Sequence, residues 1–359
     1  MKKGCPFLIC SALFGGVAAF RRWLYCKNIL KVYDATLPTI CVGNLKTGGV
    51  GKTPHVEYLV QLLQNHFQVS ILSRGYKRKI KGFLIPKKLN NEQITAFNIG
   101  DEPLQLFRKF PKVNLVLSGN RVEGFQKLVH QYPNTDVVIL DDGFQHLSFR
   151  PTLKLVLTEF VQPFFDDYPL PGGHLREFPA AAQHADMIIV TKTPRQLTVE
   201  EKNRFLTKLK LTPQQACFFT TIHYHNLIPA NSLAEKLTPL SHASLFLLTG
   251  IANPRPLVAF VEKQYAINHH FKYPDHHFFT DEDVQDILLK IGQYKTENPA
   301  ILTTEKDFMR LQDLKFESLF HQLPIYYLPI GIRFLYNQEE TFNSIIINHI
   351  KEHEHRTNS

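Results

Sequence analysis

A glycine-rich segment of the sequence is suited to hold the phosphates of a nucleotide. Residues 42–53 read Val-Gly-Asn-Leu-Lys-Thr-Gly-Gly-Val-Gly-Lys-Thr. Glycines let successive backbone N–H groups turn towards phosphate oxygens, and the start of a following helix adds the positive end of its dipole. Lys52 would reach the β- and γ-phosphates, and the Thr53 hydroxyl would hold Mg²⁺. The expected nucleotide-binding residues are Asn44, Thr47, Gly48, Gly49, Val50, Gly51, Lys52 and Thr53.

The segment departs at one position from the phosphate-loop pattern G-x-x-x-x-G-K-[ST]. The first glycine of that pattern would fall at 46, where the chain has Lys46. The rest lies between a strand-like and a helix-like stretch, which is the context that a phosphate loop requires. Nucleotide binding is therefore the stronger interpretation. A glycine-rich turn with an incidental Lys-Thr pair is the weaker one.

A pair of carboxylates supplies a candidate metal site. The apolar run at 137–140 ends in Asp141 and Asp142. In the Walker B arrangement an acid at the C-terminal end of a strand orients Mg²⁺ or its waters, although Asp-Asp is also common in turns. Strand C-termini line one edge of a parallel sheet, so these carboxylates and the phosphate loop would meet at one crevice.

Short apolar runs alternate with stretches of helical periodicity, which indicates an α/β fold. Such continuous apolar strands predict a mostly parallel sheet with helices on both faces. The expected strands of a P-loop NTPase-like domain at 36–222 lie at 39–42, 69–72, 114–117, 137–140, 153–157, 187–190 and 217–222.

The same pattern restarts after a polar stretch near 223–229. Further strands are expected at 245–249 and 300–303, and helical spacing is present at 283–291. A smaller α/β domain is therefore predicted for residues 223–359. This two-domain division agrees with a length of 359 residues.

Composition narrows the class of protein. The five cysteines are scattered and never spaced as C-x-x-C, which argues against disulfides and structural zinc and favours a reducing compartment. A net charge of +9 favours an acidic partner, such as nucleic acid, an anionic membrane or a phosphorylated substrate. A basic balance without a specific partner is the alternative.

The N-terminal segment, residues 1–35, is suited to a membrane surface. Lys2 and Lys3 precede an apolar run at 5–20, which is short for a span of about 20 residues. A signal peptide is disfavoured because a small-residue cleavage site is missing. A core helix with a basic end is the remaining alternative. The favoured interpretation is a helix in the headgroup layer, since basic and aromatic residues follow the run at Arg21, Arg22, Trp23 and Tyr25.

A series of further short motifs runs along the chain. They are Ser73-Arg74-Gly75-Tyr76, Gly100-Asp101-Glu102-Pro103, Asp141-Asp142-Gly143-Phe144-Gln145-His146, Pro171-Gly172-Gly173-His174-Leu175-Arg176-Glu177, Gly250-Ile251-Ala252-Asn253-Pro254, Pro274-Asp275-His276-His277 and Thr304-Glu305-Lys306-Asp307. Together with the phosphate loop, and in this order, they resemble the tetraacyldisaccharide 4′-kinase (lipid A 4′-kinase) family of Gram-negative bacteria. The resemblance extends from the apolar N-terminal segment to about residue 310.

The resemblance implies an ATP-dependent lipid-sugar kinase. Such an enzyme uses ATP and Mg²⁺ to phosphorylate the 4′-hydroxyl of tetraacyldisaccharide 1-phosphate, which gives lipid IV-A in lipopolysaccharide biosynthesis. It also implies two α/β domains with the active site between them. We expect a monomer on the cytoplasmic face of the inner membrane, with the lipid A precursor as its partner and no nucleic acid.

The resemblance also assigns site residues. Asp101 matches the family's base, with Glu102 beside it near the metal. From sequence alone, Asp-Glu-Pro is equally good first-turn chemistry for a helix. His276 is expected to hydrogen-bond and tune the base, in preference to His277. Arginine forks suit the 1-phosphate and the transferring group, and the expected substrate-binding residues are Arg74, Tyr76, Arg121, Arg176 and Glu177.

Two departures and two rival functions accompany the resemblance. Lys46 stands where the family often has a small hydroxyl residue, and the spacing of Gly173 and His174 also differs from the expected pattern. One rival is a partitioning or metallochaperone ATPase, but its signature lysine would lie one residue later than Lys46. The other is a non-catalytic membrane-surface or nucleic-acid-binding module, for which no nucleic-acid signature is visible.

Overall fold

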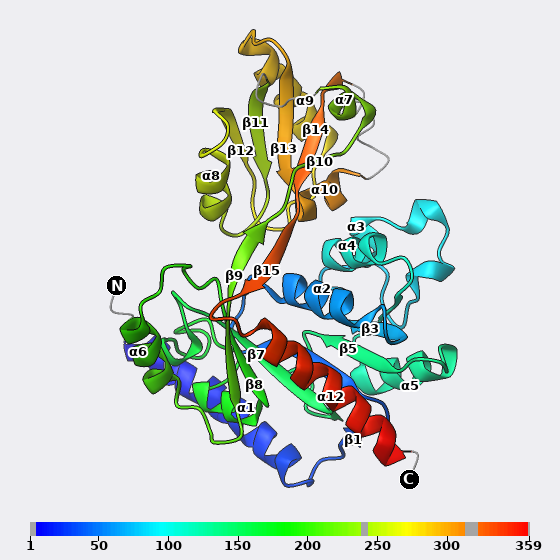
Figure 1. Ribbon diagram of the computed structural model, residues 1–359, viewed down its shortest axis with the longest axis vertical. Coiled ribbons are helices and arrows are strands. Elements are labelled where there is room, and N and C mark those ends of the chain that lie inside the picture. The colour runs from blue at the N-terminus through cyan, green and yellow to red at the C-terminus, as the bar shows by residue number, and fades with distance from the viewer. Residues whose placement is uncertain (1–4, 238–242, 313–321, 358–359) are drawn as a thin grey trace.

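The larger domain is built around an eight-stranded sheet (Figure 1). All neighbouring strands are parallel except one antiparallel pair at the edge, β15–β9. The computed structural model describes residues 5–237, 243–312 and 322–357. The spatial order of the strands is β15 (Ile330–Phe334), β9 (Ala216–Tyr224), β8 (Met187–Thr191), β7 (Leu153–Glu159), β2 (Thr39–Asn44), β5 (Val137–Asp141), β3 (Val69–Ser73) and β4 (Asn114–Leu117).

Helices cover both faces of this sheet. Successive side chains of a strand point to opposite faces, so Ile40 and Val42 lie in one apolar core and Cys41 lies in the other. The first core receives α2 (Lys52–Leu63), α4 (Asp101–Lys109) and α12 (Glu339–Thr357). The second receives α5 (Arg121–Gln131) and α6 (Val199–Leu209). The predicted parallel sheet with two covered faces is confirmed. Short elements complete the domain: β1 (Tyr33–Asp34), β6 (Phe149–Arg150) and α3 (Ala96–Ile99).

The smaller domain holds a five-stranded sheet and lies at the far end of the long axis (Figure 1). Its strands, in order, are β10 (Ile228–Pro229), β14 (Ile325–Leu328), β13 (Pro299–Thr304), β11 (Ser244–Thr249) and β12 (Ile267–Lys272). Its helices are α7 (Ser232–Lys236), α8 (Arg255–Val261), α9 (Asp281–Gln293) and α10 (Glu305–Leu311). The strands and the helix predicted in this region are all present.

The chain passes between the domains twice, on the paired strands β9 and β15 (Figure 1). After β15 it returns to the larger domain, where Phe342, Ile346 and Ile350 of α12 lie fully buried in the first core. This corrects the predicted domain at 223–359, because the segment from 330 onwards belongs to the larger domain. The prediction treated the smaller domain as one unbroken stretch of sequence. The apolar side chains of α12 do not reveal which of the two sheets the helix covers.

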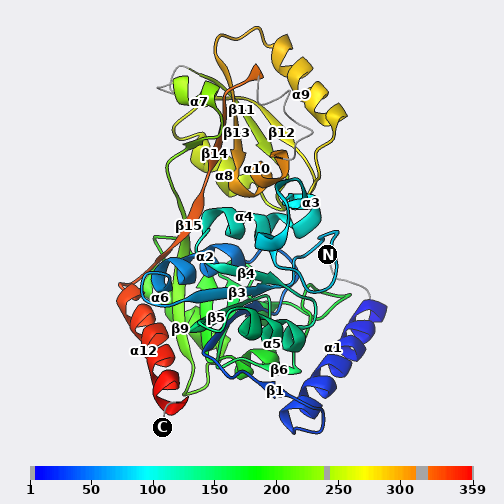
Figure 2. The ribbon, with the colours of Figure 1, turned by 90° about the vertical axis from the view of Figure 1, so that its right-hand side faces the viewer.

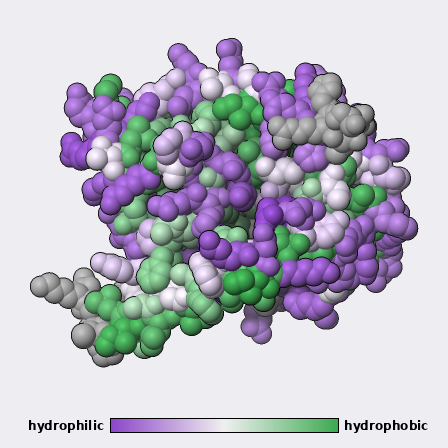
Figure 3. All heavy atoms as spheres, turned by 90° about the horizontal axis from the view of Figure 1, so that it is seen from below, coloured by the Kyte–Doolittle hydropathy of each residue, from purple (hydrophilic) through white to green (hydrophobic). Residues whose placement is uncertain are grey.

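Helix α1 (Cys5–Cys26) lies along the outside of the larger domain (Figures 1 and 2). It is long and apolar enough to cross a membrane, and only 17% of its most apolar window is buried. Figure 3 shows the apolar side chains gathered along it. Lys2 and Lys3 lie outside the described residues. Its most exposed large apolar side chains are Phe7, Ile9, Leu13, Val17 and Phe20.

A buried polar cluster joins the two domains beside α4. The Lys109 ammonium lies 2.7 Å from the Glu57 carboxylate of α2 and 3.1 Å from the Glu305 carboxylate of α10. Gln105 donates to the same two carboxylates at 2.6 and 3.2 Å. Burial raises the pKa of Glu57 from 4.5 to about 7; the neighbouring Glu305 adds to this rise, and Lys109 opposes it.

This raised pKa makes stability depend on pH. The folded carboxyl binds its proton more tightly than the unfolded one, so its stabilising effect is complete below about pH 4.5 and is lost as pH rises through 7. We expect the melting temperature of the wild type to fall more steeply between about pH 5 and about pH 8 than that of Glu57→Gln. Glu123→Gln, which alters an exposed carboxylate, is the control. Parallel curves for wild type and Glu57→Gln would contradict the assignment.

Candidate active site

The phosphate loop lies between β2 and α2, as the sequence predicts. Gly48 and Gly51 have φ values of 111° and 92°, in the left-handed region that favours glycine. The loop leads directly into the first turn of α2, whose free N–H groups and dipole favour an anion. Lys192 donates to the Gly49 carbonyl at 2.6 Å, and the Thr191 hydroxyl donates to the Val50 carbonyl at 2.8 Å. Both contacts come from the C-terminal end of β8 and the residue after it, and they fix the shape of the loop.

The functional side chains of the loop face the carboxylates at the end of β5. The Lys52 ammonium lies 3.2 Å from Asn44 Oδ1 and 3.5 Å from Asp142 Oδ1. Thr47 donates to the His174 carbonyl through its N–H and its hydroxyl, at 2.8 and 3.1 Å. Lys46 points elsewhere, with its ammonium 2.6 Å from Gln162 Oε1. The phosphate-loop lysine and the acidic pair therefore meet at one sheet edge.

Asp141 and Asp142 lie in different electrostatic environments. Asp141 is buried and accepts a 2.8 Å hydrogen bond from Ser73. Burial raises its pKa to about 6, and the nearby carboxylates of Glu102 and Asp142 add to the rise. For Asp142, the charges of Lys52 and Arg176 outweigh burial and lower the pKa. Asp141 thus sits among negative charges that a bound cation would relieve.

The donor set fits Mg²⁺. Thr53, Glu102, Asp141 and Asp142 offer hard oxygen atoms, which this cation prefers. Within the described ranges, no group of three or more carboxylate, imidazole or thiol side chains is arranged to hold a metal by itself. Mg²⁺ usually binds through one or two carboxylates, phosphate oxygens and water, so a partial protein shell is what it requires.

Asp101 lies at the start of α4, where the smaller domain touches the larger. Its Oδ1 accepts from the Glu102 N–H at 2.9 Å, and its Oδ2 lies 2.8 Å from His276 Nδ1. Oδ2 also lies 3.6 Å from Arg310 Nε and 3.9 Å from Lys306 Nζ. Burial opposes ionisation, but the His276 hydrogen bond and these two cations outweigh it and hold the pKa of Asp101 far below its usual range. Asp101 therefore contacts the first turn of its own helix and, at the same time, three side chains of the smaller domain.

The loop that carries His276 is held in a constrained backbone. His276 has a φ of 58°, in the left-handed region, and its N–H donates to the Gly250 carbonyl at 3.1 Å. Its ring meets the exposed Tyr76 ring edge-on, with centroids 5.6 Å apart. His277 instead contacts Asp283 of α9 at 2.8 Å. Of the two histidines, His276 is thus the one at Asp101.

The predicted substrate-binding residues divide into two groups. Arg74 and Tyr76 are exposed, and Arg176 lies 3.2 Å from both Asp142 oxygens. Arg121 and Glu177, in contrast, are buried in the interior. Substrate contact by these two residues stays a prediction, and in this structure their side chains contact other parts of the protein.

Arg121 and Glu177 each hold a neighbouring part of the site in place through contacts within the protein. Arg121 donates to the Asp141 carbonyl at 2.9 Å and to the Ser118 carbonyl, which fixes the end of β5. Glu177 receives both arms of Arg22 at 2.6 and 2.7 Å. Because Arg22 belongs to α1, this pair fastens the apolar helix to the loop that braces the phosphate loop.

Sequence reasoning missed several residues that the fold brings to this site. Ser73 and Gln145 lie inside the quoted motifs, and Gln145 donates to the Asn44 carbonyl at 2.8 Å. Lys306 lies 2.9 Å from Glu102 Oε1, and its signal was the Thr304-Glu305-Lys306-Asp307 motif. Arg310 lies one helical turn further along α10, which a helix prediction for that segment would have revealed.

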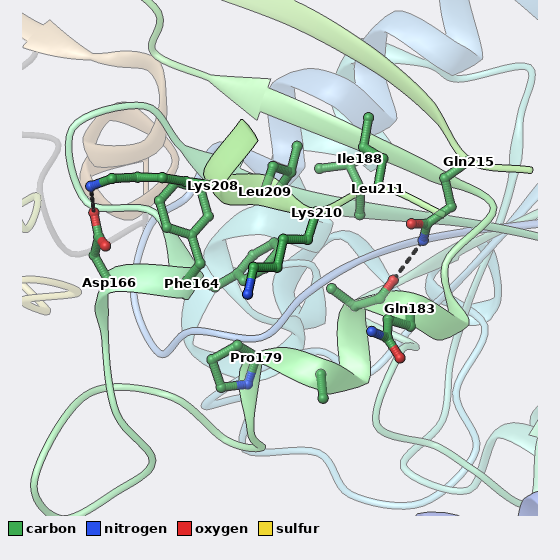
Figure 4. Close-up of a pocket in the computed structure, with 13 residues that line it drawn as sticks. Phe164, Asp166, Pro179, Gln183, Ile188, Lys208, Leu209, Lys210, Leu211 and Gln215 are labelled. Atoms are coloured by element: carbon green, nitrogen blue, oxygen red, sulfur yellow. Dashed lines mark hydrogen bonds and ion pairs between the residues drawn. The ribbon is translucent and has the colours of Figure 1, made fainter. Parts of the chain in front are cut away.

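A cavity of about 420 Å³ lies away from these residues (Figure 4). It is formed by Phe164, Pro179, Ile188, Leu209 and their neighbours, with Lys210 at its edge. None of the predicted site residues lines it. The chemistry therefore gathers at the sheet edge and the domain boundary instead of in this cavity.

A sequence profile of the tetraacyldisaccharide-1-P 4′-kinase family matches residues 5–351. This chain belongs to that family. The tetraacyldisaccharide 4′-kinase of Flavobacterium johnsoniae is 38% identical over 347 residues, which cover 97% of this chain and 96% of the relative. The enzyme of the same name from Bacteroides thetaiotaomicron is 38% identical over 355 residues, covering 95% and 92%.

A solved structure agrees with this membership. The "apo" form of LpxK from Aquifex aeolicus in complex with ATP superposes with a TM-score of 0.72 and 27% identity, covering 96% of this chain and 98% of that one. The resemblance noted from the motifs is confirmed. The chain is an ATP-dependent kinase of lipid A biosynthesis. The partitioning ATPase and the non-catalytic module are thereby removed as descriptions of it.

Proposed function

We propose that the edge shared by the phosphate loop, the acidic pair and Asp101 is where the γ-phosphate of ATP moves to the 4′-hydroxyl of tetraacyldisaccharide 1-phosphate. One observation carries this proposal. Asp101, at the start of α4, contacts His276 of the smaller domain at 2.8 Å, and its neighbour Glu102 is close enough to raise the pKa of Asp141 beside the phosphate loop. A proton acceptor and a phosphate site are thus joined at one domain boundary.

The phosphate loop would hold ATP, which is the phosphate donor. Backbone N–H groups at 47–53 would surround the phosphates, and Lys52 would exchange its contacts with Asn44 and Asp142 for phosphate oxygens. Thr53, Asp141, Asp142 and Glu102 would hold Mg²⁺, which supplies charge neutralisation at the phosphates. Arg176, 3.2 Å from Asp142, is a further cation beside the transferring group.

On the acceptor side, Asp101 would take the proton of the sugar hydroxyl. The bond from the sugar oxygen to phosphorus forms, the bond from phosphorus to the β–γ bridging oxygen breaks, and ADP leaves with that electron pair. The low pKa of Asp101 keeps it ionised and ready to accept. The hydroxyl becomes acidic only as its bond to phosphorus forms, so a positioned weak base suffices in a loose transition state.

The lipid head group would lie against the exposed residues of this edge. Arg74, Tyr76 and Arg176 offer guanidinium groups and an aromatic ring to a phosphorylated disaccharide. Arg121 and Glu177 would act indirectly. Arg121 would fix the end of β5, and Glu177 would fix the helix α1. The acyl chains would extend towards α1, whose exposed apolar face matches them.

The membrane side of the proposal rests on α1. We infer that this helix inserts its apolar face into the cytoplasmic leaflet of the inner membrane, where ATP is available, and that the enzyme acts there as a monomer without nucleic acid. Arg21 and Trp23 near its C-terminal end are exposed and suit the headgroup layer, whereas Arg22 is buried against Glu177. A peripheral or monotopic attachment accounts for a helix that is largely exposed.

Charges placed on this apolar face should release the protein from membranes. Leu13→Asp with Val17→Asp is expected to weaken flotation with phosphatidylethanolamine–phosphatidylglycerol vesicles more than about tenfold, since each side chain contributes about 1.5–3 kcal/mol when buried. Leu289→Asp with Val199→Asp alters equally exposed side chains elsewhere and serves as the control. Equal flotation of both variants would count against the assignment.

The activity is tested with γ-labelled ATP and tetraacyldisaccharide 1-phosphate in detergent micelles. The proposal predicts labelled lipid whose formation requires both substrates. ATP hydrolysis that ignores the acceptor, with no labelled lipid, would overturn it.

A further inference from the structure

Helix α4 carries a row of polar side chains along the boundary between the domains. Asp101, Gln105 and Lys109 are spaced four residues apart, so they lie on one face of the helix. In Figure 2 this helix lies between α10 of the smaller domain and α2 of the larger one. Eight residues of α-helix rise about 12 Å. Lys109 is therefore too far from Asp101 to touch the reacting atoms, and it can act on them only through other residues.

At the end of this row, Lys109 binds one carboxylate from each domain. Its ammonium lies 2.7 Å from Glu57 of α2 and 3.1 Å from Glu305 of α10. Gln105 donates to the same two carboxylates at 2.6 and 3.2 Å. The side chains of Glu57, Gln105 and Glu305 are buried. Without the ammonium, two carboxylates would face each other away from water, and buried charges that lose their partner are costly.

Glu305 connects this cluster to the groups around the base. It is the first residue of α10, and Arg310 of the same helix lies 3.6 Å from Asp101 Oδ2. Arg310 also donates to the His277 carbonyl at 3.0 Å. The neighbouring His276 lies 2.8 Å from Asp101. A shift of α10 would therefore carry both Arg310 and His276 away from Asp101.

The connection between the domains leaves their orientation to side-chain contacts. The chain passes from one domain to the other on the paired strands β9 and β15, and domains linked in this way move relative to each other unless their interface holds them. Helices α2 and α4 are fixed in the larger domain, where Val60 and Leu104 are fully buried in the first core. Glu57 and Lys109 are thus held in place, and Glu305 is the partner that moves with the smaller domain.

We propose that Lys109 is a positioning residue that binds Glu305 and so docks the smaller domain in the orientation that brings His276 and Arg310 to Asp101. This inference rests on the proposed function, in which Asp101 is the base. The larger domain then supplies the base, and the smaller domain supplies the groups that orient it. Lys109 sets how the two fit together.

A charge reversal across the domain boundary tests this role. The assays are run at about pH 8.5, above the pKa of about 7 of Glu57, so that its carboxylate is charged. Lys109→Glu should lower kcat for labelled-lipid formation about 10- to 100-fold, since small misplacements of a reacting group have effects of that size. The Kd for ATP should change by less than about threefold, because the phosphate loop lies in the larger domain. Lys109→Glu combined with Glu305→Lys restores an opposite-charge pair and should return kcat to within about fivefold of wild type.

Two comparisons separate the charge from packing and folding. Lys127→Glu alters an exposed pair with Glu123, which also lies at 2.7 Å, and should change kcat by less than about threefold. Lys109→Arg keeps the charge and should retain most of the activity, whereas Lys109→Met keeps only the apolar stem and should lower kcat about tenfold. The second comparison decides the role even if Lys109→Glu does not fold. Equal kcat in the arginine and methionine variants would overturn the inference.

A further measurement does not need activity. Amide hydrogen exchange in α10 and in the loop at 274–277 should be faster in Lys109→Glu than in wild type and should slow again in the double variant. Unchanged exchange or kcat in Lys109→Glu, a loss that the double variant does not restore, or ATP binding that weakens as much as kcat would overturn the inference. Absence of labelled lipid with wild-type protein would instead count against the proposed function, and the exchange data would still decide how the smaller domain is docked.

Discussion

Replacement of Asp101 by asparagine should lower kcat for lipid phosphorylation by about 10³-fold, within the range of about 10²–10⁴ that a general base contributes. Asparagine keeps the size of the side chain and an oxygen that can accept from His276, but it cannot take a proton. The residue lies at the domain boundary, and within the described part of the chain its side chain forms hydrogen bonds with Glu102 and His276 and none with the phosphate loop. We therefore expect the Kd for ATP to change by less than about threefold.

The measurement separates binding from turnover. ATP affinity is measured by calorimetry and kcat by labelled-lipid formation, both on Asp101→Asn and on Asp166→Asn. Asp166 is an exposed carboxylate that pairs with Lys208 at 3.5 Å and lines the cavity of Figure 4. A folded Asp101→Asn protein that loses ATP binding, or one that keeps near-normal kcat, would contradict the assignment of the base.

Removal of the Lys52 ammonium should impair binding and turnover together. In the structure this group already sits between Asn44 and Asp142, at the mouth of the phosphate loop. A charge-assisted contact with phosphate contributes about 1.5–3 kcal/mol, so Lys52→Met should weaken ATP binding by about 10- to 100-fold. kcat should fall further, because charge develops on the transferring phosphoryl group.

The same loop offers a matched control in Lys46→Met. Lys46 contacts Gln162 and lies 3.7 Å from Glu159, so it is directed away from Lys52 and the acidic pair. We expect its removal to change ATP affinity and kcat by less than about threefold. If Lys46→Met were as damaging as Lys52→Met, the distinction between the two loop lysines would be wrong.

Much of the larger domain could be predicted from the sequence. Its strands are continuous apolar runs, and the phosphate loop has a local pattern that depends only on glycine and lysine positions. The meeting of Lys52 with Asp142 followed from the rule that parallel strands end at one edge. Family motifs brought Asp101 and His276 into consideration, and the two side chains do lie in contact.

The remainder depends on long-range packing that local pattern does not encode. The return of α12 to the first sheet required knowledge of which apolar surface was uncovered. Arg121 and Glu177 carry the residue types of a phosphate or sugar site, yet each is turned inward onto a partner far along the chain, Asp141 and Arg22. Lys306 was missed because its contact with Glu102 joins residues 204 positions apart in sequence, and it exists only where the two domains meet.

The position of the transferred phosphate tests the central claim most directly. Product made by the wild-type enzyme from ATP and tetraacyldisaccharide 1-phosphate would be purified and examined by ¹H–³¹P correlation spectroscopy. The account predicts a new phosphate monoester coupled to the proton at the 4′ carbon, with the 1-phosphate unchanged. A phosphate on another hydroxyl, or a diphosphate at position 1, would contradict it.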